Sequence, residues 1–484
     1  MSKQSIFDII VVGGGGAGLA AASEAARLGL KVLLLEKDAK LGGSTALSVG
    51  LISATGTPHQ KRAGIEDTPD AHFEDLGVLG GIRVNRDNLL LRRLLVDNIT
   101  DAMDWLMSIG LEFAGPMLEP PHRAARLHNV LPNSSAFPYR LGRHCQSLGV
   151  SIQTGRPVKR LIEEDGRVVG VVAAIAGKQP EILMARRGVI LTGGDFSANA
   201  EMKEHFGGSD MRRVAAVNPD ATGDGIVIGV AHGGKVENGD LFAGPVLFFV
   251  PPPKASLLQR LPPERLNPFV MKYLTTWASP SVALFQEGAI LVTHRGGRFT
   301  DELDHPAAGL ALQPHGLGYL VFDATVAEKF SAWPHYISTA PGIAYAYLDD
   351  YRRSRKDIFH CASTPEGVAE TMGIRPRALR GTLDAYNADR DDVPRGGERR
   401  PILKPPFYGL GPVRSHVALT NGGLAITERM EVTRADGSII PGLYAAGSNG
   451  QGGLLLEGHS HHLGWAFVSG RLAAQSAARS AAAD

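Results

Sequence analysis

The N-terminal part of the chain alternates between apolar runs and glycine-rich turns. Residues 6–12 form a mainly apolar, β-branched run that is typical of a buried strand. An alanine-rich stretch, residues 19–29, predicts a helix ending at Gly29, and KVLLLE, residues 31–36, predicts a second strand. Because both strands are continuously apolar, we expect them in a parallel sheet that is covered on both faces. The predicted fold class is therefore α/β.

The turn after the first strand has the sequence GGGGAG, in which Gly13, Gly15 and Gly18 fit G-x-G-x-x-G. Glycines at these places let the backbone approach a pyrophosphate at the amino end of the following helix. Glu36 ends the second strand, where its carboxylate can accept a hydrogen bond from a ribose hydroxyl. A glycine-rich turn without a ligand is the alternative, but the strand–turn–helix–strand order favours a dinucleotide. No arginine stands beside Glu36 in the sequence, which disfavours a 2′-phosphate.

Composition narrows the function classes. The chain has 484 residues, 44% hydrophobic and 20% charged, enough for two domains or one domain with an insertion. Its net charge is +1 without a basic arm, so nucleic acid is not an expected partner. Cys145 and Cys361 form no CxxC motif, which leaves disulfide-reductase, haem and iron–sulfur chemistry unsupported and indicates a reducing compartment. The first apolar run leads into glycines as a strand does, and no stretch is long enough to span a bilayer, so we expect a cytoplasmic protein without a membrane partner.

Further motifs follow along the chain in a fixed order. They are KDAKLGGSTALSVGL (37–51), the predicted strand pair 151–173, RRGVILTGGDFSAN (186–199), ATGDGIVIGVAHGGKV (221–236), HRGGRFTDEL (294–303), LTNGGLAI (419–426) and IIPGLYAAGSNGQGG (439–453). In this order the chain resembles the fumarate reductase and succinate dehydrogenase flavoprotein family, which includes tricarballylate dehydrogenase and 3-ketosteroid dehydrogenases. The resemblance covers nearly the whole chain.

The resemblance implies an architecture and a cofactor. It implies a Rossmann-like, glutathione-reductase-like FAD-binding domain formed by residues 1–239 and 416–484, with an α+β capping domain inserted at residues 240–415. Residues 37–51 contain no histidine of the kind that tethers FAD in some relatives, so we expect non-covalent FAD. The residues expected to contact it are Gly13, Gly15, Gly16, Ala17, Gly18, Glu36, Lys37, Gly42, Gly43, Ser44, Thr45, Val158, Thr192, Gly193, Asp224, Gly447, Ser448 and Leu463. Relatives often carry an acid where Ser448 stands.

The family moves a hydride between flavin N5 and a carbon next to a carbonyl or carboxylate, and its fumarate enzymes bind the carboxylates with arginines. The chain departs from that pattern at three places. His305 and Pro306 follow the RFTDE element where relatives keep an arginine proton donor. Leu419 replaces the histidine of HHTMGG, and His462, or His461 allowing for a gap, replaces the arginine of NRLGGN. These losses disfavour fumarate and succinate and indicate a more apolar substrate with at most one carboxylate. The ketosteroid pattern also fails, because Leu456 falls where its catalytic tyrosine would be.

The segment GGLLLEGHSHHLGW, residues 452–465, concentrates the candidate acids and bases. An imidazole can exchange a proton near neutral pH, which a guanidinium cannot readily do. The candidate catalytic residues are therefore, in order, His461 and His462, then His459 and Arg298, then Glu302 as an orienting carboxylate. Three alternatives stay open: a histidine that only caps the following helix, a Glu302 that only pairs with Arg298, and a metal site, which we do not expect.

No second G-x-G-x-x-G unit is present, so we expect a small-molecule substrate and a separate electron acceptor or donor. The predicted function is an FAD-dependent dehydrogenase or ene-reductase. The alternatives are a flavin oxidase or a dehydrogenase of C–N or C–OH bonds, and a flavoprotein subunit of an electron-transfer complex.

Overall fold

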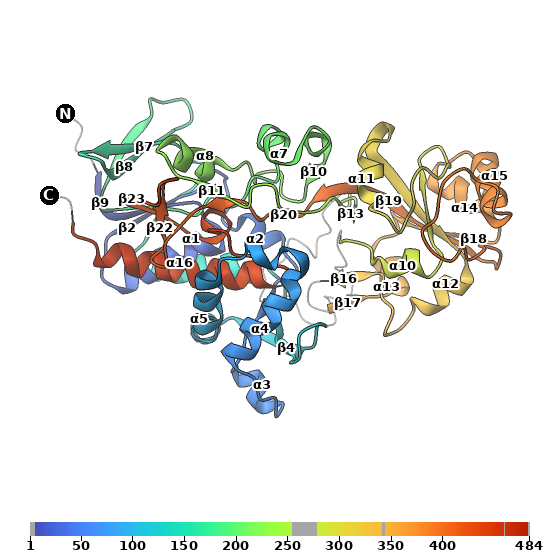
Figure 1. The fold of residues 1–484 in the computed structure, drawn as a ribbon, viewed down its shortest axis with the longest axis horizontal. Helices are drawn as coiled ribbons and strands as arrows, with labels where there is room; N and C mark the ends of the chain where they lie inside the picture. Colours follow the sequence, from blue (N-terminus) through green and yellow to red (C-terminus); the bar gives the residue numbers. More distant parts are fainter. Residues whose placement is uncertain (1–4, 254–277, 341–343, 459, 483–484) are drawn as a thin grey trace. The chain divides into compact units, whose positions relative to one another are not determined.

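The computed structural model describes residues 5–253, 278–340, 344–458 and 460–482 (Figure 1). Its contacts form two compact units. Unit 1 contains Met1–Gly207, Asn218–Phe242 and Leu419–Asp484, and unit 2 contains Gly208–Val217 and Ala243–Ala418. The sequence pattern assigns residues 208–217 to the discontinuous FAD domain, whereas their contacts lie with unit 2.

Unit 1 is built on a mixed eight-stranded sheet. Strands β23, β9, β1, β2 and β6 run parallel in that order, β22 pairs antiparallel with β23, and the β7–β8 hairpin joins antiparallel to β9. The bounds are β1 Ser5–Val12, β2 Val32–Leu35, β6 Ser151–Gln153, β7 Val158–Glu164, β8 Arg167–Ala173, β9 Glu181–Leu191, β22 Glu431–Thr433 and β23 Ile439–Ala445. The two strands and the hairpin predicted from the sequence are confirmed.

Strand β1 lies at the centre of the sheet and is covered on both faces. Its residues Ile9–Val12 pair with Val32–Leu35 on one side, and Val12 pairs with Leu191 on the other. Ile9, Ile10 and Val11 are all fully buried, although their side chains point to alternate faces. Burial on both faces explains why the run is continuously apolar.

Helices α1 (Gly16–Arg27) and α16 (His461–Arg479) pack against each other beside this sheet, and Figure 1 shows α16 running alongside the strands. Small side chains allow the close approach, because a Cβ added at Gly470 would lie 2.3 Å from the carbonyl oxygen of Ala17. Helix α16 begins at His461 itself, after Ser460 in a left-handed conformation with no side-chain capping bond. The alternative that a histidine side chain caps this helix is therefore wrong for His461, which is inside it.

Unit 1 contains further elements besides the two helices and the sheet, among them β20 Leu419–Thr420. Others are α2 Gly43–Leu47, β3 Leu51–Ser53, α3 Pro58–Arg62, α4 Pro69–Gly80, η1 Gly81–Arg86, α5 Leu89–Ser108, β4 Glu112–Met117, β5 Leu127–Leu131, α6 Ala136–Ser147, α7 Ala200–Gly207, α8 Asp224–Ala231, β11 Val236–Glu237, β21 Gly423–Leu424 and η6 Gly447–Gly450. Helix α5 packs on α16, and β3, β5 and β4 form a small antiparallel sheet.

Unit 2 has its own six-stranded sheet around the long strand β19. Its strands are β10 Ala215–Ala216, β13 Val246–Phe249, β14 Ile290–Thr293, β15 Leu317–Phe322, β18 Phe359–Ala362 and β19 Phe407–Val417. Its helices are α10 Ala283–Gln286, α11 Pro306–Ala311, α12 Ala324–Lys329, α13 Leu348–Ser354, α14 Pro365–Met372 and α15 Pro376–Asn387. Two separate apolar clusters fill this unit, so it has a core of its own. In the described parts of both units, no helix combines the length and apolarity needed to cross a membrane.

Candidate functional site

A pocket in unit 1 lies at the carboxyl ends of the parallel strands, next to the glycine turn between β1 and α1. It is lined by Val12, Gly13, Gly14, Gly15, Gly16, Ala17, Leu35, Glu36, Lys37, Asp38, Gly43, Ser44, Thr45, Arg156, Pro157, Val158, Thr192, Gly193, Gly194, Asp195, Asn218, Asp220, Ala221, Asp224, Gly225, Ile228, Gly447, Ser448 and Ala466. The crevice outside the carboxyl ends of parallel strands is the usual ligand site of such sheets.

The glycine turn is shaped by close backbone contacts. Gly13 has φ +111°, and a Cβ there would lie 2.6 Å from the carbonyl oxygen of Thr192. A Cβ at Gly18 would lie only 1.8 Å from the carbonyl oxygen of Gly13, so this position requires glycine for helix–turn packing. A Cβ at Gly15 would meet only the Gly42 oxygen at 3.9 Å, which leaves this part of the backbone facing open pocket space. The amino end of α1 thus reaches the pocket at Gly15, where the backbone is open to a ligand.

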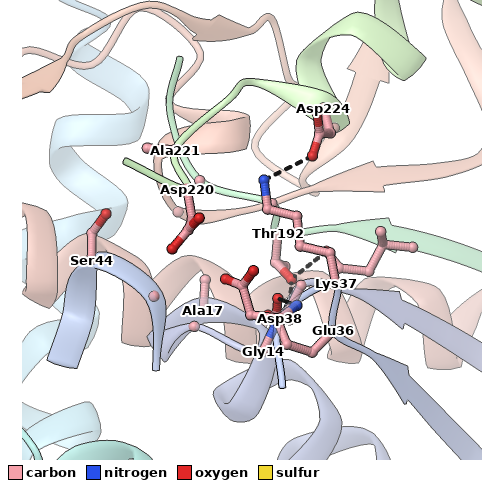
Figure 2. Close-up of a pocket in the computed structure, with 18 of the residues that line it drawn as sticks. Gly14, Ala17, Glu36, Lys37, Asp38, Ser44, Thr192, Asp220, Ala221 and Asp224 are labelled. Carbon is pink, nitrogen blue, oxygen red and sulfur yellow. Dashed lines mark hydrogen bonds and ion pairs between the residues drawn. The ribbon is translucent and has the colours of Figure 1, made fainter. Parts of the chain in front are cut away.

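Glu36 holds the turn from the end of β2. Its Oε2 accepts a hydrogen bond from the Gly14 N–H at 2.6 Å, and its Oε1 accepts one from the Asp38 N–H at 2.9 Å (Figure 2). The side chain is buried, and burial raises its pKa from the usual value. Each carboxylate oxygen still has a lone pair, so the carboxylate can also accept a ribose hydroxyl.

Other side chains tie distant segments to the pocket. Lys37 forms an ion pair with Asp224 at 2.9 Å (Figure 2). It also donates to the Thr222 hydroxyl at 2.6 Å. The Asn218 amide donates to the Ser44 hydroxyl at 2.9 Å, and the Thr45 hydroxyl accepts from the Gly16 N–H at 3.0 Å.

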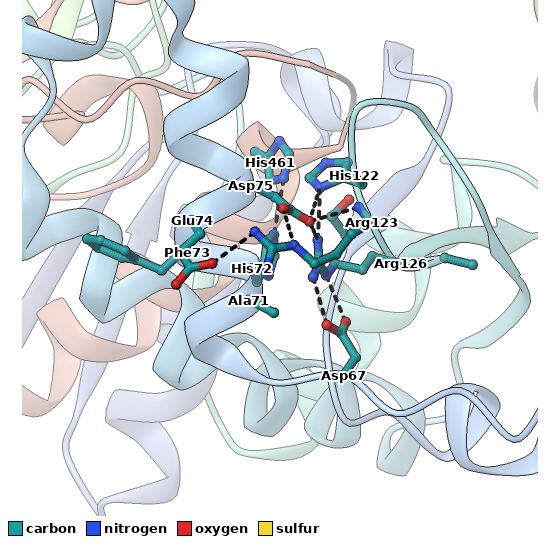
Figure 3. Close-up of polar contacts among 12 residues, drawn as sticks. Asp67, Ala71, His72, Phe73, Glu74, Asp75, His122, Arg123, Arg126 and His461 are labelled. Atoms are coloured by element: carbon teal, nitrogen blue, oxygen red, sulfur yellow. Dashed lines mark hydrogen bonds and ion pairs between the residues drawn. The ribbon is translucent and has the colours of Figure 1, made fainter.

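The histidines at the start of α16 point in different directions. His461 is 1% exposed and lies against His72 of α4 and His122, with ring centroids 5.3–5.4 Å away (Figure 3). Its Nδ1 donates to the Glu457 carbonyl oxygen at 3.0 Å, so its Nε2 accepts from His72 Nε2 at 3.3 Å. Burial lowers the pKa of His461 to about 3 and that of His72 well below the usual value. His461 is therefore a neutral, buried residue.

A buried ion-pair network contacts the same histidine cluster through His122. Arg126, which is fully buried, donates to Asp67 at 2.7 Å and to Asp75 (Figure 3). It also donates to His122 Nδ1 at 3.0 Å, which leaves the proton of neutral His122 on Nε2. Burial, followed by the charge of Arg126, lowers the pKa of His122.

His462 faces away from this cluster. Its Nε2 lies 3.2 Å from Asn421 Oδ1, and its side chain is only half-buried. Burial lowers its pKa to about 4, so it is neutral at pH 7. His461 and His462 are thus both neutral imidazoles, and their catalytic role stays a prediction. His459, the third candidate of this segment, lies outside the described residues.

The FAD binding domain family matches residues 8–454. The chain belongs to this family. NADH:fumarate oxidoreductase of Klebsiella pneumoniae (strain 342) is 28% identical over 91% of this chain and 44% of that protein. Vinyl phenol reductase of Lactiplantibacillus plantarum is 26% identical over 99% of this chain and 98% of that protein. The open conformation of a flavocytochrome c3 fumarate reductase superposes with a TM-score of 0.78 at 23% identity, covering 98% of this chain and 78% of that one. The chain thus spans less than half the length of the Klebsiella relative.

Family membership confirms the resemblance inferred from the motifs, and the flavocytochrome likeness confirms the α/β fold class with an additional sheet. The pocket fits the adenosine and diphosphate of FAD, because glycine backbone and the start of α1 face it and Glu36 stands at its side. Of the residues expected to contact FAD, all but three line the pocket. The exceptions are Gly18, which packs on Gly13; Gly42, whose N–H donates to the Gly14 oxygen; and Leu463, which packs in the core. The contacts of all these residues with FAD stay a prediction.

Several pocket residues have no counterpart in the sequence prediction. Asp38 follows Lys37 directly and could have been found from its position, but Asn218 and Asp220 come from a segment far along the chain. Arg156 also lines the pocket and is held by Glu181 at 2.7 Å. No arginine is next to Glu36 in the sequence, but Arg156 lies beside it in the fold. The backbone N–H of Arg156 donates to the backbone carbonyl oxygen of Glu36.

Arg298 and Glu302, the catalytic candidates of unit 2, pair with each other inside that unit. Arg298 donates twice to Glu302, at 2.9 and 2.8 Å, and contacts Asp391. Glu302 is fully buried and also accepts from Arg395 at 2.9 Å and from the Leu291 N–H at 3.1 Å. All these partners belong to unit 2 and satisfy the carboxylate, which favours the structural alternative. Within the described residues, no group of three or more His, Cys, Asp or Glu is arranged to hold a metal ion.

Proposed function

We propose that the chain is an FAD-dependent reductase or dehydrogenase of a carbon–carbon bond next to a carbonyl or carboxylate, with a substrate more apolar than fumarate. This proposal is carried by an FAD-family chain in which the resemblance puts His462, or His461 allowing for a gap, where fumarate enzymes keep a carboxylate-binding arginine. The flavin supplies the hydride chemistry when bound. The residues of the chain bind and orient the substrate and exchange its proton.

His462 is the proposed substrate-binding residue of unit 1. It is half-buried and neutral, so it can make a hydrogen bond to a substrate without burying a charge. An arginine at this place would instead favour an anion, through paired donors matched to a carboxylate.

Two relatives bear on the substrate class. One is named for fumarate and the other, which matches this chain over nearly its full length, for a vinyl phenol. The replacement of the arginine supports an aromatic or alicyclic substrate with at most one carboxylate.

We propose that FAD is bound without a covalent link. Residues 37–51 contain no histidine of the kind that tethers FAD in some relatives, which supports this proposal. Precipitation of the purified holoprotein with acid is expected to release all of the yellow flavin into the supernatant. Flavin that stays with the pellet would contradict this.

A separate electron donor or acceptor is part of the proposal. The Klebsiella relative is more than twice as long as its matched part, and its name includes NADH. FAD would occupy the pocket described in unit 1. We therefore expect electrons to come from another protein or domain. The cytoplasmic location stays a prediction.

An anaerobic titration of the purified flavoprotein tests the function. Bleaching of the flavin by a saturated ketone or acid with formation of the alkene, or reoxidation of the reduced flavin by the alkene, supports the proposal. Rapid reoxidation by oxygen with release of peroxide supports an oxidase instead, and reduction only by a partner protein supports an electron-transfer subunit. The variant with alanine at both His461 and His462 is expected to lose reaction with the substrate while keeping its flavin.

A further inference from the structure

The side chain of His462 takes part in a short chain of hydrogen bonds that fixes where its proton sits. Gln451 Nε2 donates to the Leu454 carbonyl oxygen at 2.8 Å and to Asn421 Oδ1 at 3.0 Å. His462 Nε2 lies 3.2 Å from the same oxygen. Gln451 and Asn421 are 0% and 2% exposed, so water does not compete for these groups.

The direction of each bond follows from the partners. The Leu454 carbonyl can only accept, so the nitrogen of the Gln451 amide must face it. The same nitrogen meets Asn421, and two amide nitrogens would repel, so the Asn421 atom there is the oxygen. An amide oxygen can only accept, hence His462 must carry its proton on Nε2.

The other nitrogen of His462 is left as an acceptor. A neutral imidazole with Nε2–H has a bare lone pair on Nδ1. Within the described residues Nδ1 has no hydrogen-bond partner, and it is not among the buried unpaired atoms. It is therefore not fully buried.

We propose that Asn421, held by Gln451, is a positioning residue that fixes His462 as a hydrogen-bond acceptor, and that the substrate presents a hydroxyl hydrogen to Nδ1. This rests on the proposed role of His462 in substrate binding. An arginine can only donate, so the replacement of that arginine reverses the polarity of this contact from donor to acceptor. A phenol or enol hydroxyl fits an accepting imidazole, whereas a carboxylate meets a lone pair and is disfavoured.

Nitrogen-15 NMR of the holoprotein, labelled in its histidine rings, measures the tautomer directly. His462 signals are assigned by their loss in His462→Gln. We expect a protonated Nε2 and an unprotonated Nδ1 at pH 7.5, and a mixture of tautomers in Asn421→Leu. A protonated Nδ1 in the wild-type protein, or no change in Asn421→Leu, overturns the proposal.

A matched substitution tests the substrate class. Asn421→Asp keeps an oxygen that accepts from Gln451 and His462, but its negative charge favours the doubly protonated imidazolium. In the wild type, burial lowers the pKa of His462, and its neighbours Asn421, Gln451 and Leu454 carry no charge. In this variant Nδ1 becomes a donor. Visible absorbance and thermal melting check that the variant is folded and loaded with flavin.

Three probes report the polarity of the site: 4-hydroxybenzylideneacetone, its methyl ether, and the analogue with a 4-carboxylate. Binding is followed by the His462 nitrogen signals and by the flavin spectrum. The wild type is expected to bind the phenol about tenfold more tightly than the ether, since the ether leaves Nδ1 unpaired. Asn421→Asp is expected to move the preference toward the carboxylate. Equal binding of phenol and ether by the wild type, or an unchanged preference in Asn421→Asp, overturns the assignment of the substrate class.

Different results would exclude the role of His462 in substrate binding and its positioning by Asn421. If His462→Ala leaves reaction of the flavin with its alkene substrate unchanged, the proposed role of His462 is wrong. If His462→Ala abolishes that reaction while the tautomer and the probe preferences do not respond to Asn421, only the positioning inference is wrong.

Discussion

Glu36 has two roles in the structure. It accepts hydrogen bonds from the N–H groups of Gly14 and Asp38 and lines the pocket proposed for FAD. Glu36→Ala removes both backbone contacts and the acceptor for a ribose hydroxyl. Bonds to a charged acceptor are each worth about 1.5–3 kcal/mol, so we expect FAD affinity to fall by at least tenfold.

Titration of the apoprotein with FAD, followed by quenching of flavin fluorescence, measures this loss. Glu164→Gln at an exposed end of β7 is the control and should bind FAD as the wild type does. Equal affinity of Glu36→Ala and the control would mean that Glu36 only shapes the turn.

Gly18 tests the packing of the glycine turn. A Cβ here would lie 1.8 Å from the Gly13 oxygen, which is backbone that cannot yield without moving the turn. Gly18→Ala is therefore expected to lower the thermal melting temperature and to abolish FAD binding. Gly381→Ala is the matched control, because a Cβ there meets nothing within 4 Å and the residue is exposed inside helix α15. We expect the control to be stabilised by about 0.5–1 kcal/mol.

At the scale of elements, the histidine cluster joins α4, the segment before β5 and the start of α16 (Figure 3). Burial lowers the pKa values of His72, His122 and His461 below 6.5, so the folded state binds fewer protons than the unfolded chain. The stability from this cluster is fully present above pH 6.5 and is lost as the pH falls below it. For His461, with a pKa of about 3, the loss is about 2 kcal/mol at pH 5.0.

Urea unfolding at pH 7.5 and pH 5.0 measures this effect. His461→Gln removes one titrating group and should lose less stability between the two pH values than the wild type. The control is His305→Asn. The His305 side chain is 89% exposed, and asparagine tolerates the left-handed backbone conformation at this position. A pH response of His461→Gln equal to that of the wild type would show that the cluster is not the source of acid sensitivity.

A substitution in the ion-pair network of unit 2 distinguishes a structural role of Glu302 from a catalytic one. Glu302→Gln leaves the buried guanidinium groups of Arg298 and Arg395 without their shared charge partner. Loss of one partner of a buried pair costs about 3–5 kcal/mol, so the melting temperature should fall clearly. At a temperature where the variant is folded, flavin reaction with substrate should be close to the wild-type rate. A large loss of rate without a loss of stability would favour the catalytic prediction.

At the scale of the whole molecule, the sequence predicts what is local and misses what the chain brings together over long distances. The strand, the glycine turn and Glu36 lie within a short segment, and their order is enough to predict a dinucleotide site where the structure has a pocket. His72 and His461 are 389 positions apart, and no pattern in either segment indicates that they meet. The histidine run therefore predicts candidate chemistry but not which side chain is buried. Neighbouring positions on a helix point about 100° apart, which is why His461 and His462 reach different surroundings.

Because of the pocket lining, FAD binding should stabilise unit 1 more than unit 2. Every residue that lines the pocket belongs to unit 1. A ligand that binds only the folded state stabilises it by about 2.7 kcal/mol at a hundredfold excess over its Kd. Removal of FAD is therefore expected to raise amide hydrogen exchange most in β1, β2, the start of α1 and residues 218–228, all of unit 1. Exchange in β14, β15 and β19 of unit 2, which have a core of their own, should change much less. Mass spectrometry of matched apo- and holoprotein measures both regions in one sample, and an equal rise in the two would contradict an FAD site built from unit 1.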